Sequence, residues 1–144
     1  MTALVASRLI KQLATVTTRR FPVAAATAVW EGGMVALSGA GAAAVAVPAS
    51  ANPALKVVGV AQADANNLAG AAGAMTVDAK VGTFLMNNSA TDPVALGDVG
   101  SPVYAVDDNT VSKTGAPTSG SPTQPQAGFL WAIDPSGGVW VRFV

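Results

Sequence analysis

The feature that most constrains the fold is a series of short apolar stretches, interrupted by turn-forming residues at intervals of about 8–12 positions. Glycine, proline and asparagine supply most interruptions, as at Gly32-Gly33, Asn87-Asn88 and residues 136–138. These residue types adopt left-handed backbone or fix φ, so each group marks a turn of the chain. The pattern predicts an all-β, antiparallel fold: a jelly-roll-like β-sandwich or barrel without long α-helices.

Each expected strand is a stretch of mainly β-branched, aromatic or small apolar residues between two turns. The last one alternates, with Val139, Val141 and Phe143 on one side and Trp140 and Arg142 on the other. Residues 63–73 are expected to be a loop because of their glycines and paired asparagines. The expected strands cover residues 15–19, 23–27, 34–37, 43–47, 56–61, 75–78, 83–86, 103–106 with 110–113 as a hairpin, 129–133 and 139–144.

The chain length of 144 residues fits one domain with one hydrophobic core. We expect residues 1–20 to form a basic N-terminal arm and residues 21–144 to form a single β-sandwich domain. The arm contains Arg8, Lys11, Arg19 and Arg20 and no acidic residue, so the rest of the chain is net acidic. Residues 114–126 are rich in Pro, Gly, Ser, Thr and Gln and are predicted to be an exposed, flexible loop.

Composition excludes several classes of function. Apolar residues make up 51% of the chain and charged residues only 11%, which predicts that a partner covers part of the surface. Eight basic residues balance eight acidic ones, so no overall field attracts nucleic acid or an anionic membrane. No stretch reaches the roughly 20 uninterrupted apolar residues that a bilayer span needs, and residues 1–20 lack the apolar region of a signal peptide.

The sequence contains few side chains that could carry out catalysis. The chain has no cysteine or histidine, which removes thiolate nucleophiles, imidazole bases and most transition-metal sites. Most acidic residues stand singly beside turn residues, where short carboxylates cap turns. We therefore expect no enzyme activity, no catalytic residues and no metal site.

Two local patterns resemble ligand motifs and have simpler explanations. Residues 39–44, GAGAAA, fit a dinucleotide-binding fingerprint, but the alternating residues 45–48 end at a proline where that motif needs a helix. We interpret them as a β-hairpin turn and expect no cofactor. The cluster Asp107-Asp108-Asn109 lacks the further ligands and central glycine of a calcium loop, so it is predicted to be a hairpin tip.

Three tryptophans are large enough to build the core of a small domain or to anchor an interface. For Trp30 and Trp131, core is the expectation. Trp140 differs because it shares its strand face with Arg142, and an interface accommodates both residue types. Trp140 and Arg142 are therefore the candidate residues for self-association.

Several stretches of the chain carry a resemblance to a known group of proteins. They are residues 24–37 (AAATAVWEGGMVAL), 55–61 (LKVVGVA), 87–93 (NNSATDP), 98–108 (DVGSPVYAVDD) with 110–113 (TVSK), and 138–142 (GVWVR). Through these turn-and-strand phrases the chain resembles the capsid cement, or decoration, proteins of tailed bacteriophages. The resemblance covers most of the length.

The resemblance implies a structural virion protein, assembled in the host cytoplasm, that binds the outer surface of the major capsid shell and stabilises it. Its partners would be the major capsid protein and itself, with a dimer favoured over a trimer. The arm residues Arg8, Lys11, Arg19 and Arg20 are the candidates for contact with the capsid, because an acidic shell would attract them.

Two alternatives stay open at the level of sequence. A small β-sandwich that binds carbohydrate would display coplanar aromatic rings on one exposed face. A phage tail-tube or baseplate subunit would share the virion context but form rings. The sequence does not separate these firmly from a cement protein.

Overall fold

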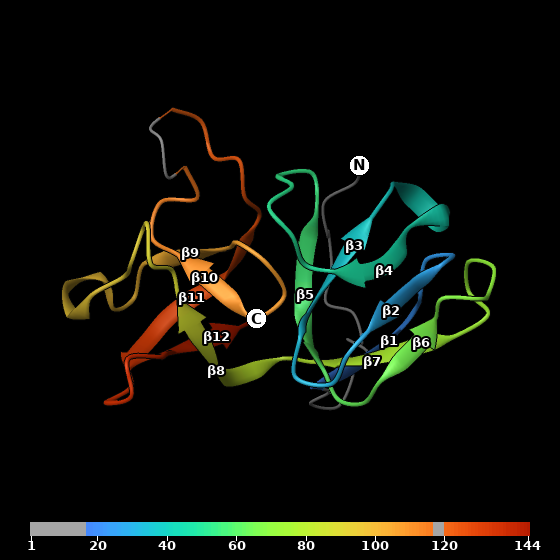
Figure 1. The fold of residues 1–144 in the computed structure, drawn as a ribbon, viewed down its shortest axis with the longest axis horizontal. Coiled ribbons are helices and arrows are strands. Elements are labelled where there is room, and N and C mark those ends of the chain that lie inside the picture. The colour runs from blue at the N-terminus through green and yellow to red at the C-terminus, as the bar shows by residue number, and fades with distance from the viewer. Residues whose placement is uncertain (1–16, 117–119) are drawn as a thin grey trace, which may run out of the picture.

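The computed structural model describes residues 17–116 and 120–144, and it shows an all-β chain of short strands joined by turns and two short 3-10 helices (Figure 1). The strands, with η1 and η2 for the 3-10 helices, are β1 (Thr18–Pro22), β2 (Thr27–Val29), β3 (Met34–Ser38), η1 (Gly41–Ala43), β4 (Val45–Pro48), β5 (Lys56–Ala61), β6 (Ala65–Asn67), β7 (Thr76–Lys80), β8 (Gly82–Asn88), η2 (Leu96–Asp98), β9 (Pro102–Ala105), β10 (Thr110–Ser112), β11 (Gln126–Ile133) and β12 (Val139–Phe143).

The first half of the chain, with β7, builds a five-stranded sheet in the order β1-β7-β5-β3-β4, and all its pairs are antiparallel. β1 and β4 are its two end strands. Just after β1, Val23 forms a parallel bridge with Ala46 of β4, and the Ala24 amide donates to the Ala46 carbonyl at 3.0 Å. This bridge brings the two ends of the sheet together, so the sheet nearly closes on itself.

A short antiparallel pair, β2 with β6, accompanies this sheet. One core cluster gathers here, and its fully buried members are all valine or alanine. Such small side chains allow the strands and their cover to approach closely. The cluster contains Val23, Val29, Val35, Ala46, Val58, Ala61, Ala65, Val77 and Ala79, with Phe21 and Leu37 packed against it.

The second half of the chain forms a closed five-stranded barrel in the order β10-β8-β12-β11-β9 (Figure 1). Its pairs are antiparallel except for β10 with β8, which run parallel. Closure leaves no free strand edge in this half. The buried hydrophobic residues of the barrel strands are Met86, Val103, Ala105, Val111, Ala127, Leu130, Val139, Val141 and Phe143.

Both faces of β3 are buried, which joins the two halves. Met34 and Ala36 belong to the same cluster as the barrel residues, whereas Val35 and Leu37 belong to the cluster of the sheet half. Alternate side chains of a strand point to opposite faces, so a strand with four consecutive apolar residues, Met34 to Leu37, suits burial between two layers. The core therefore divides into two clusters, where the sequence predicted one.

The all-β and mainly antiparallel prediction is confirmed, and most strands lie within a few residues of their expected positions. Residues 39–44 form the turn of the antiparallel β3–β4 hairpin, as expected. Two predictions are wrong. The strand expected at 23–27 is β2, shifted to Thr27–Val29, and β6 lies within residues 63–73, which were expected to be a loop.

Two of the predicted segments, the N-terminal arm and the loop at 114–126, differ from the structure at their C-terminal ends. β1 runs from Thr18 to Pro22 and so crosses the boundary that the sequence placed after residue 20. In the segment 114–126, Gln124 is buried, its side chain accepts a hydrogen bond from the Ser112 hydroxyl, and the Pro125 carbonyl accepts from the Ala105 amide at 2.9 Å. Exposure therefore does not extend to the end of the segment that enters β11.

No helix in the described part of the chain has the length and apolar character to cross a bilayer.

Candidate interaction surface

The final strand, β12, separates its side chains cleanly between the inside and the outside of the barrel. Val139, Val141 and Phe143 are buried, while Trp140 is partly exposed and Arg142 is exposed. This alternation is the one that the sequence predicted. The structure thus places Trp140 and Arg142 together on the outer face of the barrel.

The neighbouring strand β8 extends this outer face. In the antiparallel register Leu85 stands opposite Trp140, and Thr83 stands opposite Arg142. Leu85 is 47% exposed, although it is a large aliphatic residue in the middle of a strand. A β-carbon on Gly138 would lie 3.1 Å from Leu85 Cδ1, so the turn before β12 lies against the Leu85 side chain.

On the other side of β12, strand β11 contributes Trp131. The pairing of β11 with β12 shifts between Leu130 and Ala132, and this irregularity contains Trp131. Trp131 is 58% exposed, and the Arg142 guanidinium carbon lies 5.7 Å from the centroid of its ring. This is cation–π geometry. We call Leu85, Trp131, Trp140 and Arg142 the barrel face.

Trp140 is held in place by the turn between β11 and β12. Its indole Nε1 donates to Asp134 Oδ1 at 3.1 Å, and the Ser136 amide and hydroxyl donate to Asp134 Oδ2. The hydrogen bonds from Ser136, together with that from Trp140, lower the pKa of Asp134. The carboxylate therefore fixes the ring of Trp140 against the barrel without any covalent constraint.

A second exposed apolar group lies in the loop before β9. Leu96 is 76% exposed and Val99 is 47% exposed. Backbone hydrogen bonds tie this loop to the middle of β11: the Gly100 amide donates to the Leu130 carbonyl at 2.8 Å, and the Leu130 amide donates to the Ser101 carbonyl at 3.0 Å. The loop that carries these two exposed side chains is thus held against β11.

The loop is further held by Asp98. Its Oδ1 lies 3.1 Å from Lys113 Nζ, and its Oδ2 accepts from the Ala95 amide at 2.8 Å. The Ala95 amide and the Lys113 ammonium lower the pKa of this carboxyl. Its ionised form is therefore part of what orders the loop.

Of the four arm residues, Arg8 and Lys11 lie outside the described residues, and Arg19 and Arg20 lie in β1. Arg19 donates to the Val58 carbonyl at 2.8 Å and lies 5.6 Å from the Phe21 ring centroid. Arg20 forms a two-point ion pair with Asp78, at 2.7 and 2.9 Å, which raises the pKa of Arg20 and lowers that of Asp78. Both guanidinium groups already have partners within the chain.

The expectation that Trp30 and Trp131 are core residues is wrong, since the two residues are 49% and 58% exposed. For Trp131 the reason is local. Residues 129–133 are apolar at every position, so the sequence gives no alternation from which to choose a face, and the irregularity in β11 shifts the face within the strand. Leu85 was missed for a related reason: its neighbours Phe84 and Met86 are also apolar.

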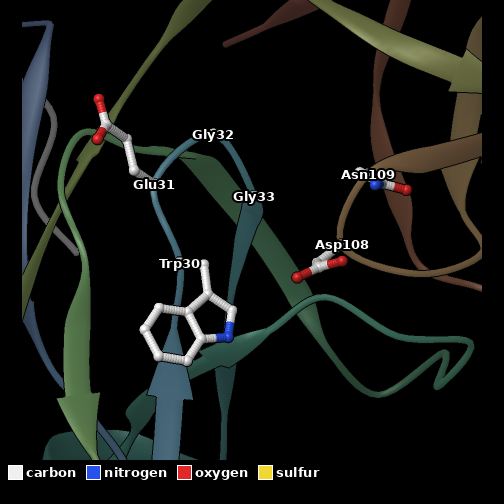
Figure 2. Close-up of a pocket in the computed structure, with 6 residues that line it drawn as sticks. All are labelled: Trp30, Glu31, Gly32, Gly33, Asp108 and Asn109. Atoms are coloured by element: carbon white, nitrogen blue, oxygen red, sulfur yellow. The ribbon is translucent and has the colours of Figure 1, made fainter.

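Away from the barrel face, the tip of the β9–β10 hairpin meets the turn between β2 and β3. Residues 107–109 form this tip, as predicted, with the Val106 amide bonded to the Thr110 carbonyl at 2.9 Å. A pocket of about 390 Å³ opens between the two turns (Figure 2), lined by Trp30, Glu31, Gly32, Gly33, Asp108 and Asn109. Within residues 17–116 and 120–144, no three acidic side chains lie together in a group that could hold a metal ion.

Comparisons of the chain with models of known protein families, with characterised proteins and with solved structures find no match. The function is therefore inferred from the residues and the geometry of this chain.

Proposed function

We propose that the chain is a structural virion protein: a capsid cement, or decoration, protein that binds the outer surface of the major capsid shell and stabilises it. The observation that carries the proposal is the barrel face, an exposed apolar and aromatic surface on a chain in which only 11% of residues are charged. Such a surface is typical of a protein that is covered by a partner.

The composition of the barrel face supports binding to protein. Trp and Arg are enriched at protein interfaces and among the residues that dominate binding energy. Here Arg142 lies over Trp131, and Leu85 stands opposite Trp140, so charged and apolar contacts share one surface. We assign this surface to self-association because Trp140 and Arg142 lie at its centre. We favour a dimer over a trimer.

The arm is the second contact in the proposal. Arg19 and Arg20 are already engaged in β1, so Arg8 and Lys11 are the arm residues left to dock on an acidic shell. In this proposal the body has a jelly-roll-like topology, and residues 1–20 act as the arm.

A shell presents the same contact many times, which suits a weak binder with two contacts. A dimer whose arms engage neighbouring shell subunits turns the second binding event into an intramolecular one, and the overall affinity rises without any new kind of contact. The proposed role requires no catalytic step, and the chain has no histidine or cysteine to supply one. In this role the protein is assembled in the host cytoplasm and resides on the outside of the virion.

The test is co-sedimentation of purified protein with shells assembled from the major capsid protein of the same virus. We expect binding to expanded shells that exceeds binding to unexpanded ones, and a raised temperature of shell disruption. A protein that sediments with neither form would contradict the proposal.

Deletion of residues 1–16 tests the arm. The deletion stops there because Thr18–Pro22 form β1, and removing them would open the sheet. We expect weaker shell binding with unchanged β-rich circular dichroism. A second variant, which replaces Arg8 and Lys11 with Gln in the full chain, should weaken binding similarly. Undiminished binding by both variants would remove the arm from the proposal.

A further inference from the structure

The pocket between the β2–β3 turn and the β9–β10 hairpin tip is built on rigid backbone. The Met34 amide donates to the Asp108 carbonyl at 2.6 Å, which ties the two turns together. The Gly32 amide donates to the Ala61 carbonyl and the Ala61 amide donates to the Gly33 carbonyl, both at 2.9 Å. Backbone hydrogen bonds therefore connect both walls of the pocket to each other and to β5.

The groups that face the pocket form an unusual set. Trp30 is 49% exposed, so much of the ring is open to a ligand. Figure 2 shows the Asp108 carboxylate on the Gly33 side of the pocket, and a β-carbon on Gly33 would lie 3.2 Å from Asp108 Oδ2. Glu31 points away from Asp108 in the same view. The pocket thus offers one aromatic ring and one inward carboxylate.

The Asp108 carboxylate has no cationic partner within the described part of the chain. The salt bridges there join Arg20 to Asp78 and Lys113 to Asp98, and none of the lining residues is basic. Partial burial, with the neighbouring charge of Asp107, raises the pKa of Asp108. A bound cation would supply the missing counter-charge.

We propose that this pocket binds an arginine side chain of a partner protein, with the guanidinium stacked on Trp30 and paired to the Asp108 carboxylate. Arginine fits better than lysine because its planar group can stack on the ring and present two parallel N–H donors to the carboxylate at once. This inference stands apart from the proposed function, since it concerns a different surface and holds for any partner that presents the side chain.

Other occupants fit less well. A calcium ion takes six to eight oxygen ligands, and the pocket presents one inward carboxylate. A sugar would need several free donors and acceptors beside the ring. Asn109 is poorly placed to supply them, because its Oδ1 already accepts from the Thr110 hydroxyl at 3.0 Å and from Asn87 Nδ2 at 3.4 Å.

The test uses ¹⁵N-labelled full-length protein and the indole N–H signals of its three tryptophans in heteronuclear NMR. The probe is the peptide acetyl-Gly-Arg-Gly-amide, and its controls replace arginine with citrulline, which keeps the shape without the charge, or with lysine. We expect saturable movement of the Trp30 signal with the arginine peptide, weaker movement with lysine and none with citrulline. The Trp131 and Trp140 signals should stay in place.

Asp108→Asn should weaken binding of the arginine peptide about tenfold, the usual size for the loss of a charged hydrogen-bond partner. Asp92→Asn is the matched control, because it removes a carboxylate that does not line the pocket, and it should change the affinity less than twofold. Unmoved Trp131 and Trp140 signals show that the variants are folded.

Three results would overturn the inference: an unmoved Trp30 signal, equal movement with the citrulline peptide, or an Asp108→Asn variant that binds as tightly as the unaltered protein. Movement of Trp30 with neutral monosaccharides but not with the arginine peptide would assign the pocket to sugars instead. None of these results bears on shell binding, so failure here is distinguishable from failure of the proposed function.

Discussion

The sheet half and the barrel half of the molecule solve the same packing problem in different ways. The buried residues of the sheet-half cluster are all valine and alanine, whereas the barrel strands also bury Met86, Leu130 and Phe143. The sheet half relies on strands that approach closely and is covered by β2 and β6. The barrel half relies on larger side chains inside a closed ring of strands.

This difference bears on where a partner can bind. In the sheet half, β3 is buried on both faces, so this strand has little exposed surface to which a partner could bind. In the barrel half, closure satisfies the strands by hydrogen bonds around the ring, and only the inner face is needed for the core. The outer face is then free to carry large apolar residues such as Leu85 and Trp131, which are exposed there.

The largest expected effect comes from truncating a large buried side chain in the barrel core. Leu130→Ala removes a side chain that is 1% exposed, and should lower the free energy of unfolding by about 2–5 kcal/mol because a cavity remains in a ring that cannot collapse. Urea unfolding followed by circular dichroism measures this. Leu96→Ala is the matched control, because Leu96 is exposed, and it should stay within about 0.5 kcal/mol of the unaltered protein. Equal effects would refute the account of the barrel core.

The second-largest expected effect tests the close contact between paired strands of the sheet half. Gly59 has φ of +148°, and an added β-carbon would lie 2.7 Å from the Lys80 carbonyl oxygen on the paired strand. Gly59→Ala should therefore destabilise the protein by about 1–3 kcal/mol. Gly97→Ala serves as the control, because its β-carbon would meet nothing within 4 Å. If the two variants unfold at the same urea concentration, the sheet half does not depend on the close contact at Gly59.

The smallest expected effects concern Asp134 and Asp108, whose pKa values shift in opposite directions. The pKa of Asp134 is lowered, so its contribution to stability is complete above the pKa of the unfolded chain, about 3.9, and is lost as pH falls through the lower folded value. The pKa of Asp108 is raised, so its ionisation weakens the fold and stability falls as pH rises through that value. Thermal unfolding at pH 7 should show a lower midpoint for Asp134→Asn and a slightly higher one for Asp108→Asn. The reverse order would contradict both assignments.

Sequence patterns predicted the fold class and most strands because turn residues and β-branched stretches act locally. They also predicted the two faces of β12, where Val139 and Val141 alternate with Trp140 and Arg142. β6 escaped prediction because Ala65–Asn67 has little strand propensity, and its pairing with β2 comes from tertiary contacts. A second core cluster could not be foreseen from an apolar β3, since the pattern does not say what covers each face.

The candidate site was predicted only in part. Trp140 and Arg142 followed from alternation, but Leu85 and Trp131 needed the strand register and the irregularity in β11. The pocket beside Trp30 joins residues about 75 positions apart in the chain, a distance at which turn chemistry carries no information. Long-range pairing, rather than local preference, places those side chains together.

The most direct test of the central claim, that the barrel face binds a second copy of this chain, is sedimentation equilibrium. We predict a dimer for the unaltered protein at micromolar concentrations and a folded monomer for the double variant Leu85→Ser/Trp131→Ser. Leu68→Ser, which alters a residue of the sheet half that is as exposed as Trp131, should leave the dimer intact. A monomeric unaltered protein, or a double variant that still forms dimers, would contradict the claim.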